Sequence, residues 1–228
     1  MSPQTDLEAL YRDLHAHPEL GFQEHRTASI AAEHMRTLGL EVIEGIGHTG
    51  VAAILTNGDG PTVWLRADMD GLPVEERTGL EYASLATGVG PDGETVPVMH
   101  ACGHDMHVTW LIGAVEDLVA SRGEWSGTIV AIFQPAEETI AGAQAMIDDD
   151  LVGRVPSPSV VLGQHVGPLP AGIVSVTTGT AMAGADDLSI VLHGRGGHGS
   201  RPETTIDPVL AAANTVVRLQ SIVSREVT

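Results

Sequence analysis

The chain has 228 residues, 43% of them hydrophobic, which is enough to bury one sizeable domain core or one and a fraction. Thirty acidic residues against eleven basic ones give a formal net charge of -19, which disfavours nucleic acid and anionic membranes as partners. Because the chain has a single cysteine, no secretion signal at its start and no apolar run of the roughly 18–20 residues that a membrane span needs, we expect a soluble, cytoplasmic protein without an intramolecular disulfide.

Two helices are predicted before the first strand. Thr5 and Glu8 have the spacing of a capping box, and apolar residues at helical intervals follow, which predicts a helix over about 6–16. A second helix is predicted over 24–38, and Gly39 stands where a C-terminal cap belongs.

Two strands and a third helix follow. VAAIL (51–55) and TVWLRADMD (62–70) are typical of strands, and the glycine-rich turn between them predicts that the two pair as a hairpin. The next helix is predicted over 105–121, with Met106 and Trp110 among its inward-facing residues.

The later elements complete an alternating pattern. GTIVAIFQ (127–134) and SVVLGQHV (159–166) predict buried strands, and residues 141–151 between them predict a helix. Strands alternating with helices indicate an α/β domain with a mixed, largely parallel sheet flanked by helices. From about residue 171 the pattern changes, which indicates the start of a second, smaller α/β unit with a helix over about 207–224.

Chemically reactive side chains gather where the predicted strands end. Asp68 and Asp70 close one strand, Glu137 and Glu138 follow another, and His165 closes a third. Functional residues of α/β sheets lie at the carboxyl ends of the strands, so we expect these groups to converge.

The segment MHACGHDMH (99–107) holds the one cysteine together with three histidines and an aspartate. In extended backbone, side chains two positions apart point to the same side, so Cys102 and His104 can share one metal ion, as can Asp68 and Asp70. This spacing favours a metal site.

Adjacent residues point apart, and this matters for Glu137 and Glu138. One of them can bind a metal while the other acts as a general base toward water that the metal activates, as in hydrolytic metal sites. Thiolate, imidazole and carboxylate donors together suit Zn, Co, Ni or Mn better than Mg or Ca. The number of ligand groups leaves room for two ions about 3.5–4 Å apart.

Each of these groups has a structural alternative when it is taken alone. Cys102 would be a buried core thiol, His100 and His107 would be surface or capping residues, and Asp68 and Asp70 would cap a turn. The glutamate pair would lie on a solvent-exposed face. Because all of them fall at or near predicted strand ends, the joint metal-site interpretation is favoured.

Six motifs, in chain order, resemble the amidohydrolase branch of the M20 metallopeptidase family, which includes hippurate hydrolases, N-acyl-amino-acid deacylases and auxin-conjugate hydrolases. They are HAHPELGFQEHRTA (15–28), LRADMDGLPVEE (65–76), MHACGHDMH (99–107), FQPAEE (133–138), GQHVGPLPAG (163–172) and GRGGHGSRP (194–202). The resemblance covers essentially the whole chain. It implies that residues 1–178 are the N-terminal portion of a metal-dependent catalytic domain and that 179–228 begin a lid domain through which a homodimer forms.

The resemblance also implies roles for individual residues. Glu137 is the general base, and Asp70 matches the catalytic aspartate that orients groups around the site. The implied metal ligands are Cys102, His104, Glu138 and His165.

Further positions match the family motifs or lie beside them. Asp68 stands where other branches of the superfamily have a metal-binding histidine, and Asp105 is expected to support a ligand imidazole. His198 matches a lid histidine that contacts substrate or stabilises an oxyanion, with a plain turn histidine as the alternative. Arg195 and Arg201 are either ligands of a substrate carboxylate or surface residues.

The function implied is hydrolysis of the amide bond of small N-acyl amino acids, hippurate-like or N-acetylated, by metal-activated water and a glutamate base. The implied cofactor is a pair of divalent ions, Mn, Zn, Co or Ni, per complete subunit. Family members continue beyond residue 228 and supply a further histidine ligand, so we expect a truncated chain. The alternatives are a catalytically incomplete homologue that serves as a dimerisation or partner-binding module and, less favoured, a true peptidase.

Overall fold

The computed structural model describes residues 5–181 and 188–226, and the chain divides into two compact units, Met1–Leu169 and Pro170–Thr228. The helices of the first unit are α1 (Leu7–Ala16), α2 (His25–Thr37), α3 (His104–Ala120), the short 3-10 turn η1 (Arg122–Glu124), α4 (Gly142–Asp148) and α5 (Leu151–Arg154). Its strands are β1 (Glu41–Ile46), β2 (Gly50–Asn57), β3 (Thr62–Asp68), β4 (Thr87–Val89), β5 (Thr95–Pro97), β6 (Gly127–Gln134) and β7 (Val160–Gly163). Within the described ranges, no helix has both the length and the apolarity to cross a membrane.

A mixed sheet with the strand order β1-β2-β6-β3-β7 forms the centre of the first unit, which confirms the predicted α/β class. The pairs β1–β2 and β2–β6 are antiparallel, whereas β3 runs parallel to both β6 and β7. The carboxyl ends of β3, β6 and β7 therefore lie at one edge of the sheet. A separate pair, β4–β5, forms within the loop that precedes α3.

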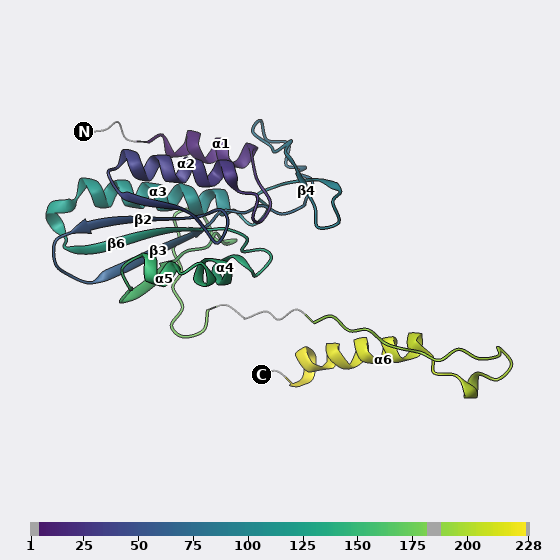
Figure 1. Cartoon of the computed structure of the whole chain (residues 1–228). Coiled ribbons are helices and arrows are strands. Elements are labelled where there is room, and N and C mark those ends of the chain that lie inside the picture. The colour runs from purple at the N-terminus through teal and green to yellow at the C-terminus, as the bar shows by residue number, and fades with distance from the viewer. Residues whose placement is uncertain (1–4, 182–187, 227–228) are drawn as a thin grey trace. The chain divides into compact units, whose positions relative to one another are not determined.

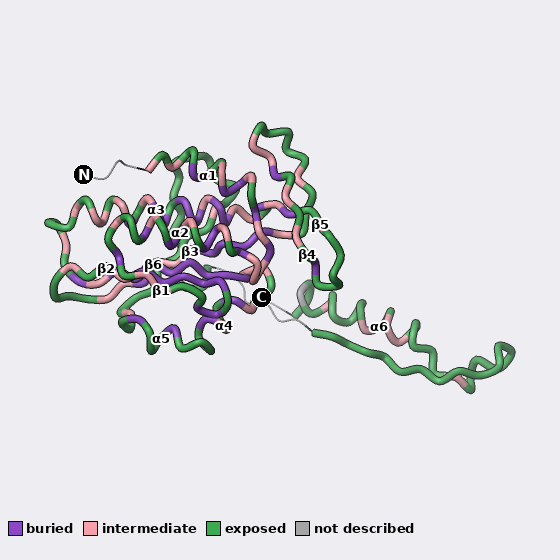
Figure 2. Tube along the Cα trace, turned by 45° about the horizontal axis from the view of Figure 1, so that its top comes forward, coloured by how far each residue is buried: buried purple, intermediate pink, exposed green. Residues whose placement is uncertain are grey.

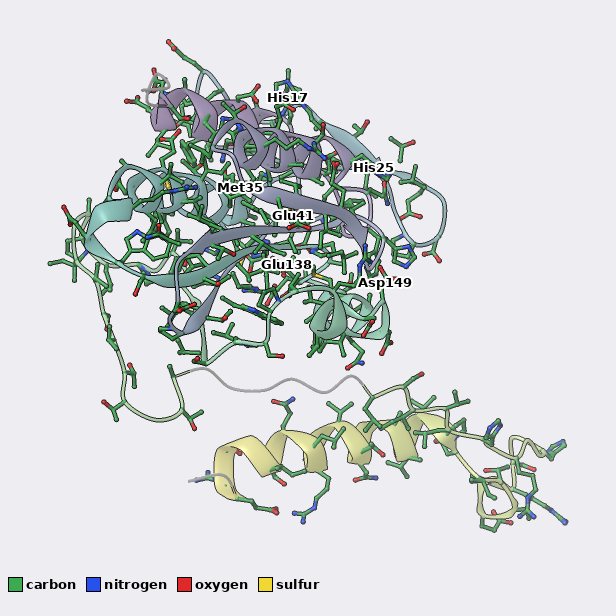
Figure 3. All side chains as sticks on the ribbon, turned by 60° about the vertical axis from the view of Figure 1, so that its left-hand side comes forward. His17, His25, Met35, Glu41, Glu138 and Asp149 are labelled. Carbon is green, nitrogen blue, oxygen red and sulfur yellow. The ribbon has the colours of Figure 1, made fainter. Side chains whose placement is uncertain are left out.

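Helices cover both faces of this sheet, as Figure 1 shows, with α1, α2 and α3 on one side and α4 and α5 on the other. The first interface buries Leu14 of α1, Met35 of α2 and Ile112 of α3 against Phe133 of β6 (Met35 is labelled in Figure 3). The second packs Met146 and other apolar side chains against the opposite face. Because both faces of β6 are buried, its sequence is a continuous apolar run instead of an alternating one.

The predicted hairpin between 51–55 and 62–70 is wrong. Strand β6 lies between β2 and β3 and pairs with both, so those two strands are separated by two strand spacings, roughly 9–10 Å. Their connection crosses the start of β6 so closely that a Cβ atom on Gly60 would lie 2.9 Å from the Cα of Gly127. The glycine-rich turn permits this crossing.

Strand β7 differs from the expected buried strand over 159–166. It is shorter, and Val161 is 54% exposed, because β7 has β3 as its one neighbour among the described strands. The helix predicted over 141–151 is instead two short helices, since Asp150 has a left-handed backbone with φ 60° that separates α4 from α5.

Two details of the predicted helices also change. The N-cap of α1 is Asp6, whose carboxylate accepts a hydrogen bond from the Ala9 amide, whereas Thr5 bonds to Glu116 of α3. On α3, Trp110 is 41% exposed and the buried face carries Val108, Leu111, Ile112 and Val115. The apolar residues of α3 surround much of the helix, so periodicity alone does not define which side faces the core.

The second unit contains α6 (Pro208–Ser221), the short 3-10 turn η2 (Pro202–Thr204) and a π-helical turn, η3 (Ile222–Glu226). The side chain of Asp207 caps α6 by accepting hydrogen bonds from the amides of Val209 and Leu210. Most described residues of this unit are exposed (Figure 2). The unit begins at Pro170, and the assignment of 179–228 to a lid domain stays a prediction.

Leu14 and Leu85 offer a matched test of the packing, because one is fully buried and the other is 95% exposed. Leu14→Ala should lower the free energy of unfolding by about 2–5 kcal/mol, since it leaves a cavity under α1. Leu85→Ala should change it by no more than about 0.5 kcal/mol. Urea denaturation of both variants measures the difference, and equal losses would contradict the described core.

Candidate metal centre

The beginning of α3 brings the cysteine motif to the edge where the parallel strands end. Gly103 has a left-handed backbone with φ 82°, which turns the chain sharply between Cys102 and His104. A Cβ atom on Gly103 would lie 2.6 Å from the Cγ2 of Val166, so a glycine is also required by this close approach. The residue before Val166 is His165, and the motif therefore meets the segment that follows β7.

The structure brings all five predicted ligand and base residues together around His104. Single donor atoms of Cys102, His104 and His165 all lie within 4.8 Å of one another, and those of His104, Glu137 and Glu138 do the same. The sulfur of Cys102 is 3.4 Å from Nε2 of His165. Nε2 of His104 is 3.9 Å from Oε2 of Glu137 and 3.9 Å from Oε1 of Glu138 (Glu138 is labelled in Figure 3).

Asp70 links two members of this group through its two oxygens. Its Oδ1 lies 3.1 Å from Nδ1 of His104, and its Oδ2 accepts a hydrogen bond from the backbone amide of Glu138 at 3.0 Å. With Nδ1 engaged, Nε2 is the one nitrogen that His104 can offer to a metal. His104 can therefore bind only one ion at a time.

The donor atoms fit a cation better than they fit one another. Nε2 of His104 and Oε1 of Glu138 are buried and have no hydrogen-bond partner among the described residues. Donor atoms about 2.0–2.3 Å from one tetrahedral ion lie roughly 3–4 Å apart. The distances of 3.4 Å between Cys102 and His165 and of 3.9 Å from His104 to each glutamate fall in this range. Buried polar atoms without partners are costly, and a bound divalent ion would satisfy both.

The pKa shifts in the cluster also favour a bound cation. Burial, followed by the carboxylates of Glu138 and Glu137, raises the pKa of the Cys102 thiol to about 12. Burial also raises the pKa of Glu138 against the opposing effect of His104. For His104, burial lowers the pKa, but the hydrogen bond to Asp70 and the negative charges nearby outweigh it and leave the pKa raised. The site thus concentrates negative charge around one imidazole, as suits a divalent cation.

A third donor group, Asp68 with His104 and His107, fits a metal less well. Nδ1 of His107 lies 2.6 Å from Oδ1 of Asp68, and Nε2 of the same ring accepts the Val166 amide at 2.9 Å. Arg66 pairs with the other oxygen of Asp68 at 2.7 Å. For Asp68, burial raises the pKa, but the hydrogen bond from His107 and the charges of His104 and Arg66 outweigh it and lower the pKa to about 2.

Two structural alternatives and one expectation for the histidine motif are corrected. His107 is fully buried and His100 is 4% exposed, so neither is a surface residue. Burial lowers the pKa of His100 to about 4. Asp105 does not support a ligand imidazole, because its Oδ2 lies 2.6 Å from Nδ1 of His15 on α1.

A buried contact from the first motif also supports the glutamate loop, and sequence reasoning did not predict it. Glu24 is fully buried and accepts hydrogen bonds from the Thr49 hydroxyl at 2.5 Å and the Ala136 amide at 2.7 Å. Ala136 has a left-handed φ of 46° and immediately precedes Glu137. An acidic residue at the start of a helix is common, and Ala136 is 112 residues away, so no local pattern pointed to this contact.

His198, Arg195 and Arg201 belong to the second unit and are exposed. Nδ1 of His198 contacts the Ser200 hydroxyl at 2.8 Å, and Arg195 donates to the Thr204 carbonyl at 3.0 Å. Their roles toward a substrate stay predictions.

Comparison with known proteins gives three similar relatives. Hippurate hydrolase of Campylobacter jejuni is 42% identical over 226 residues, covering 98% of this chain and 56% of the relative. Thermostable carboxypeptidase 1 of Saccharolobus solfataricus is 41% identical over 221 residues, with coverages of 95% and 53%. N-acetylcysteine deacetylase of Bacillus subtilis is 40% identical over 226 residues, with coverages of 98% and 56%. The chain spans about half the length of these relatives.

Solved structures share the fold. A protein of methicillin-resistant Staphylococcus aureus described as an aminohydrolase matches with a TM-score of 0.79 and 32% identity, covering 100% of this chain and 58% of the other. A dinuclear metal-binding peptidase of the M20 family from Bacillus subtilis matches with a TM-score of 0.63 and 37% identity, with coverages of 72% and 43%. Residues 64–225, more than half of the chain, match the profile of Peptidase family M20/M25/M40, and the chain therefore belongs to that family.

Proposed function

We propose that the protein hydrolyses the amide bond of small N-acyl amino acids at a centre that holds divalent metal ions. The observation that carries this proposal is the convergence of a thiol, two imidazoles and two carboxylates, with Nε2 of His104 buried and unpartnered among the described residues. The proposed ligands are Cys102, His104, Glu138 and His165. The metals considered are Mn, Zn, Co and Ni, because soft and borderline donors are mixed.

A bound divalent cation supplies positive charge that polarises the substrate carbonyl and makes water more acidic. Glu137 takes the proton from the attacking water and delivers it to the leaving amide nitrogen, so that one water and one amide yield a carboxylate and a free amine. The greater exposure of Glu137, 40% against 22% for the Glu138 side chain, supports this division, because the base must reach water while the ligand is enclosed.

Asp70 acts as an orienting residue in this scheme. It contacts the imidazole of one proposed ligand, His104, and the backbone amide of the other, Glu138. A fully buried carboxylate with both oxygens engaged holds these two groups at a fixed separation. The proposed geometry of the site therefore depends on Asp70 without requiring it to bind the metal.

The proposed substrate class rests on the relatives. A hippurate hydrolase and an N-acetylcysteine deacetylase, each at least 40% identical, favour an acylated amino acid. The carboxypeptidase at 41% identity makes a peptide with a free carboxyl end the second candidate. Both substrates present an amide next to an amino acid carboxylate. We propose that His198 contacts the reacting carbonyl and that Arg195 binds that carboxylate.

We propose a homodimer through residues 179–228. The apolar side chains of Val209, Val216 and Val217 on α6 are 59–76% exposed. Exposed apolar side chains grouped on one helix are typical of a surface that another chain covers.

The test of this function is amino acid release by the full-length gene product loaded with Mn, Co, Ni or Zn. N-acetyl and N-benzoyl amino acids should be cleaved faster than unblocked dipeptides. Faster cleavage of the dipeptides would favour the carboxypeptidase candidate. Release from neither class, with metal bound, would overturn the proposal.

Glu137→Gln tests the proposed base with a side chain of nearly the same size. Because an amide cannot accept the proton from water, kcat should fall by about 10²–10⁴-fold. Metal content, measured by elemental analysis, should equal that of the wild type. Loss of the metal would mean that Glu137 is a ligand.

Cys102→Ser tests the proposed thiolate ligand, and the metal content of the chain is the measurement. A hydroxyl is a poor ligand beside a thiolate, so the variant should retain less Zn²⁺ after dialysis than the wild type does. Equal retention would remove Cys102 from the ligand set. A wild-type chain that retains no ion would instead favour a dimerisation or partner-binding module.

A further inference from the structure

His107 takes no part in the proposed chemistry, yet it is fully buried next to it. It lies on α3 three residues after His104, on the same side of the helix, and its ring centroid is 4.7 Å from that of His165. Both nitrogens of this buried imidazole have hydrogen-bond partners, so the fold fixes the orientation of the ring.

The partners of His107 fix its tautomer. Nε2 accepts a hydrogen bond from the backbone N–H of Val166 at 2.9 Å, so the ring carries its hydrogen on Nδ1. That hydrogen is donated to Oδ1 of Asp68 at 2.6 Å. Because the lone pair of Nε2 is occupied by an amide hydrogen, His107 is a support for the site and not one of its ligands.

Val166 connects His107 to a proposed ligand through a single residue. Its N–H is held by His107, and its carbonyl accepts a hydrogen bond from Nδ1 of His165 at 2.6 Å. With its hydrogen on Nδ1, His165 presents the free lone pair of Nε2 toward Cys102, 3.4 Å away. The order of contacts is thus Asp68, His107, the backbone of Val166, and then the ring of His165.

His165 needs such support because of its place in the fold. It follows β7, a short and exposed strand with one neighbour among the described strands, and is itself exposed. The side chain of Val166 fills the space over Gly103, which leaves the amide of Val166 directed at His107. Two contacts with the start of α3 therefore hold the residue after His165.

We propose that His107 is a positioning residue: by holding the Val166 backbone, it sets the tautomer and direction of the His165 imidazole at the metal centre. This inference rests on the proposed function, since it takes His165 as a metal ligand. Hydrogen-bond partners of ligand imidazoles are worth about 10–100-fold in metal affinity.

The test is a Zn²⁺ titration of the whole chain by calorimetry, with the urea midpoint of the metal-free chain as a second readout. His107→Phe removes both hydrogen bonds and should weaken Zn²⁺ binding by about 10–100-fold. His107→Gln keeps an oxygen that can accept the Val166 amide and should recover most of that loss. Trp110→Leu is the matched control. The ring centroid of Trp110 lies 5.9 Å from that of His107, with the two rings stacked, and the substitution leaves both hydrogen bonds of His107 in place.

A second pair keeps the test decisive if His107→Phe does not fold. Val166→Pro removes the donor N–H of that contact. Val166→Ala keeps the N–H but also loses the valine side chain that packs over Gly103, so it is the control, and the proline variant should bind Zn²⁺ more weakly than the alanine variant. Wild-type affinity in His107→Phe, or equal affinity in the two Val166 variants, would overturn the positioning role. A wild-type chain with no affinity for Zn²⁺ would overturn the proposed function itself.

Discussion

The structure of the site depends on the repulsion among acidic groups at one edge of the sheet. Asp68 and Asp70 follow from β3, and Glu137 and Glu138 follow from β6, whose carboxyl end lies beside that of β3. Four carboxylates so close together, two of them buried, are unfavourable unless a positive charge balances them. Arg66 pairs with Asp68, and His104 is the imidazole that the remaining acids surround. A divalent cation is the charge that this arrangement still needs.

The fold holds these groups by fixing their neighbours. Asp70 contacts His104 and the amide of Glu138, while Glu24 supports the amide of Ala136 just before the glutamate pair. Gly103 permits the turn that starts α3 and the close approach of Val166. The proposed ligands therefore come from separate stretches of sequence, but the residues around them are held by contacts made within the same unit.

Short-range patterns in the sequence were sufficient for much of this description. The strand over 127–134 was predicted with its observed ends, because a strand buried on both faces is a continuous apolar run. The grouping of Cys102 and His104 with the residues at the strand ends followed from the alternation of strands and helices. Each of these inferences uses only neighbouring residues and the general geometry of α/β sheets.

Contacts between distant residues were beyond such reasoning. The hairpin between β2 and β3 was predicted because no local pattern indicates that another strand pairs between them. That strand is β6, some seventy residues later in the chain. The partner of Asp105 is His15, which is 90 residues away on α1, and the neighbour of His107 is the Val166 amide, a backbone group that no side-chain motif reveals. Propensity and spacing restrict what a residue can do, but tertiary packing selects its partner.

The central claim is that the sulfur of Cys102 and the imidazoles of His104 and His165 share a bound cation. X-ray absorption spectroscopy of the Zn²⁺-loaded protein tests it most directly, because sulfur scatters differently from nitrogen and oxygen. We expect a sulfur neighbour at about 2.3 Å together with nitrogen or oxygen neighbours at about 2.0–2.1 Å from the ion. A spectrum that requires nitrogen and oxygen neighbours alone would contradict the account.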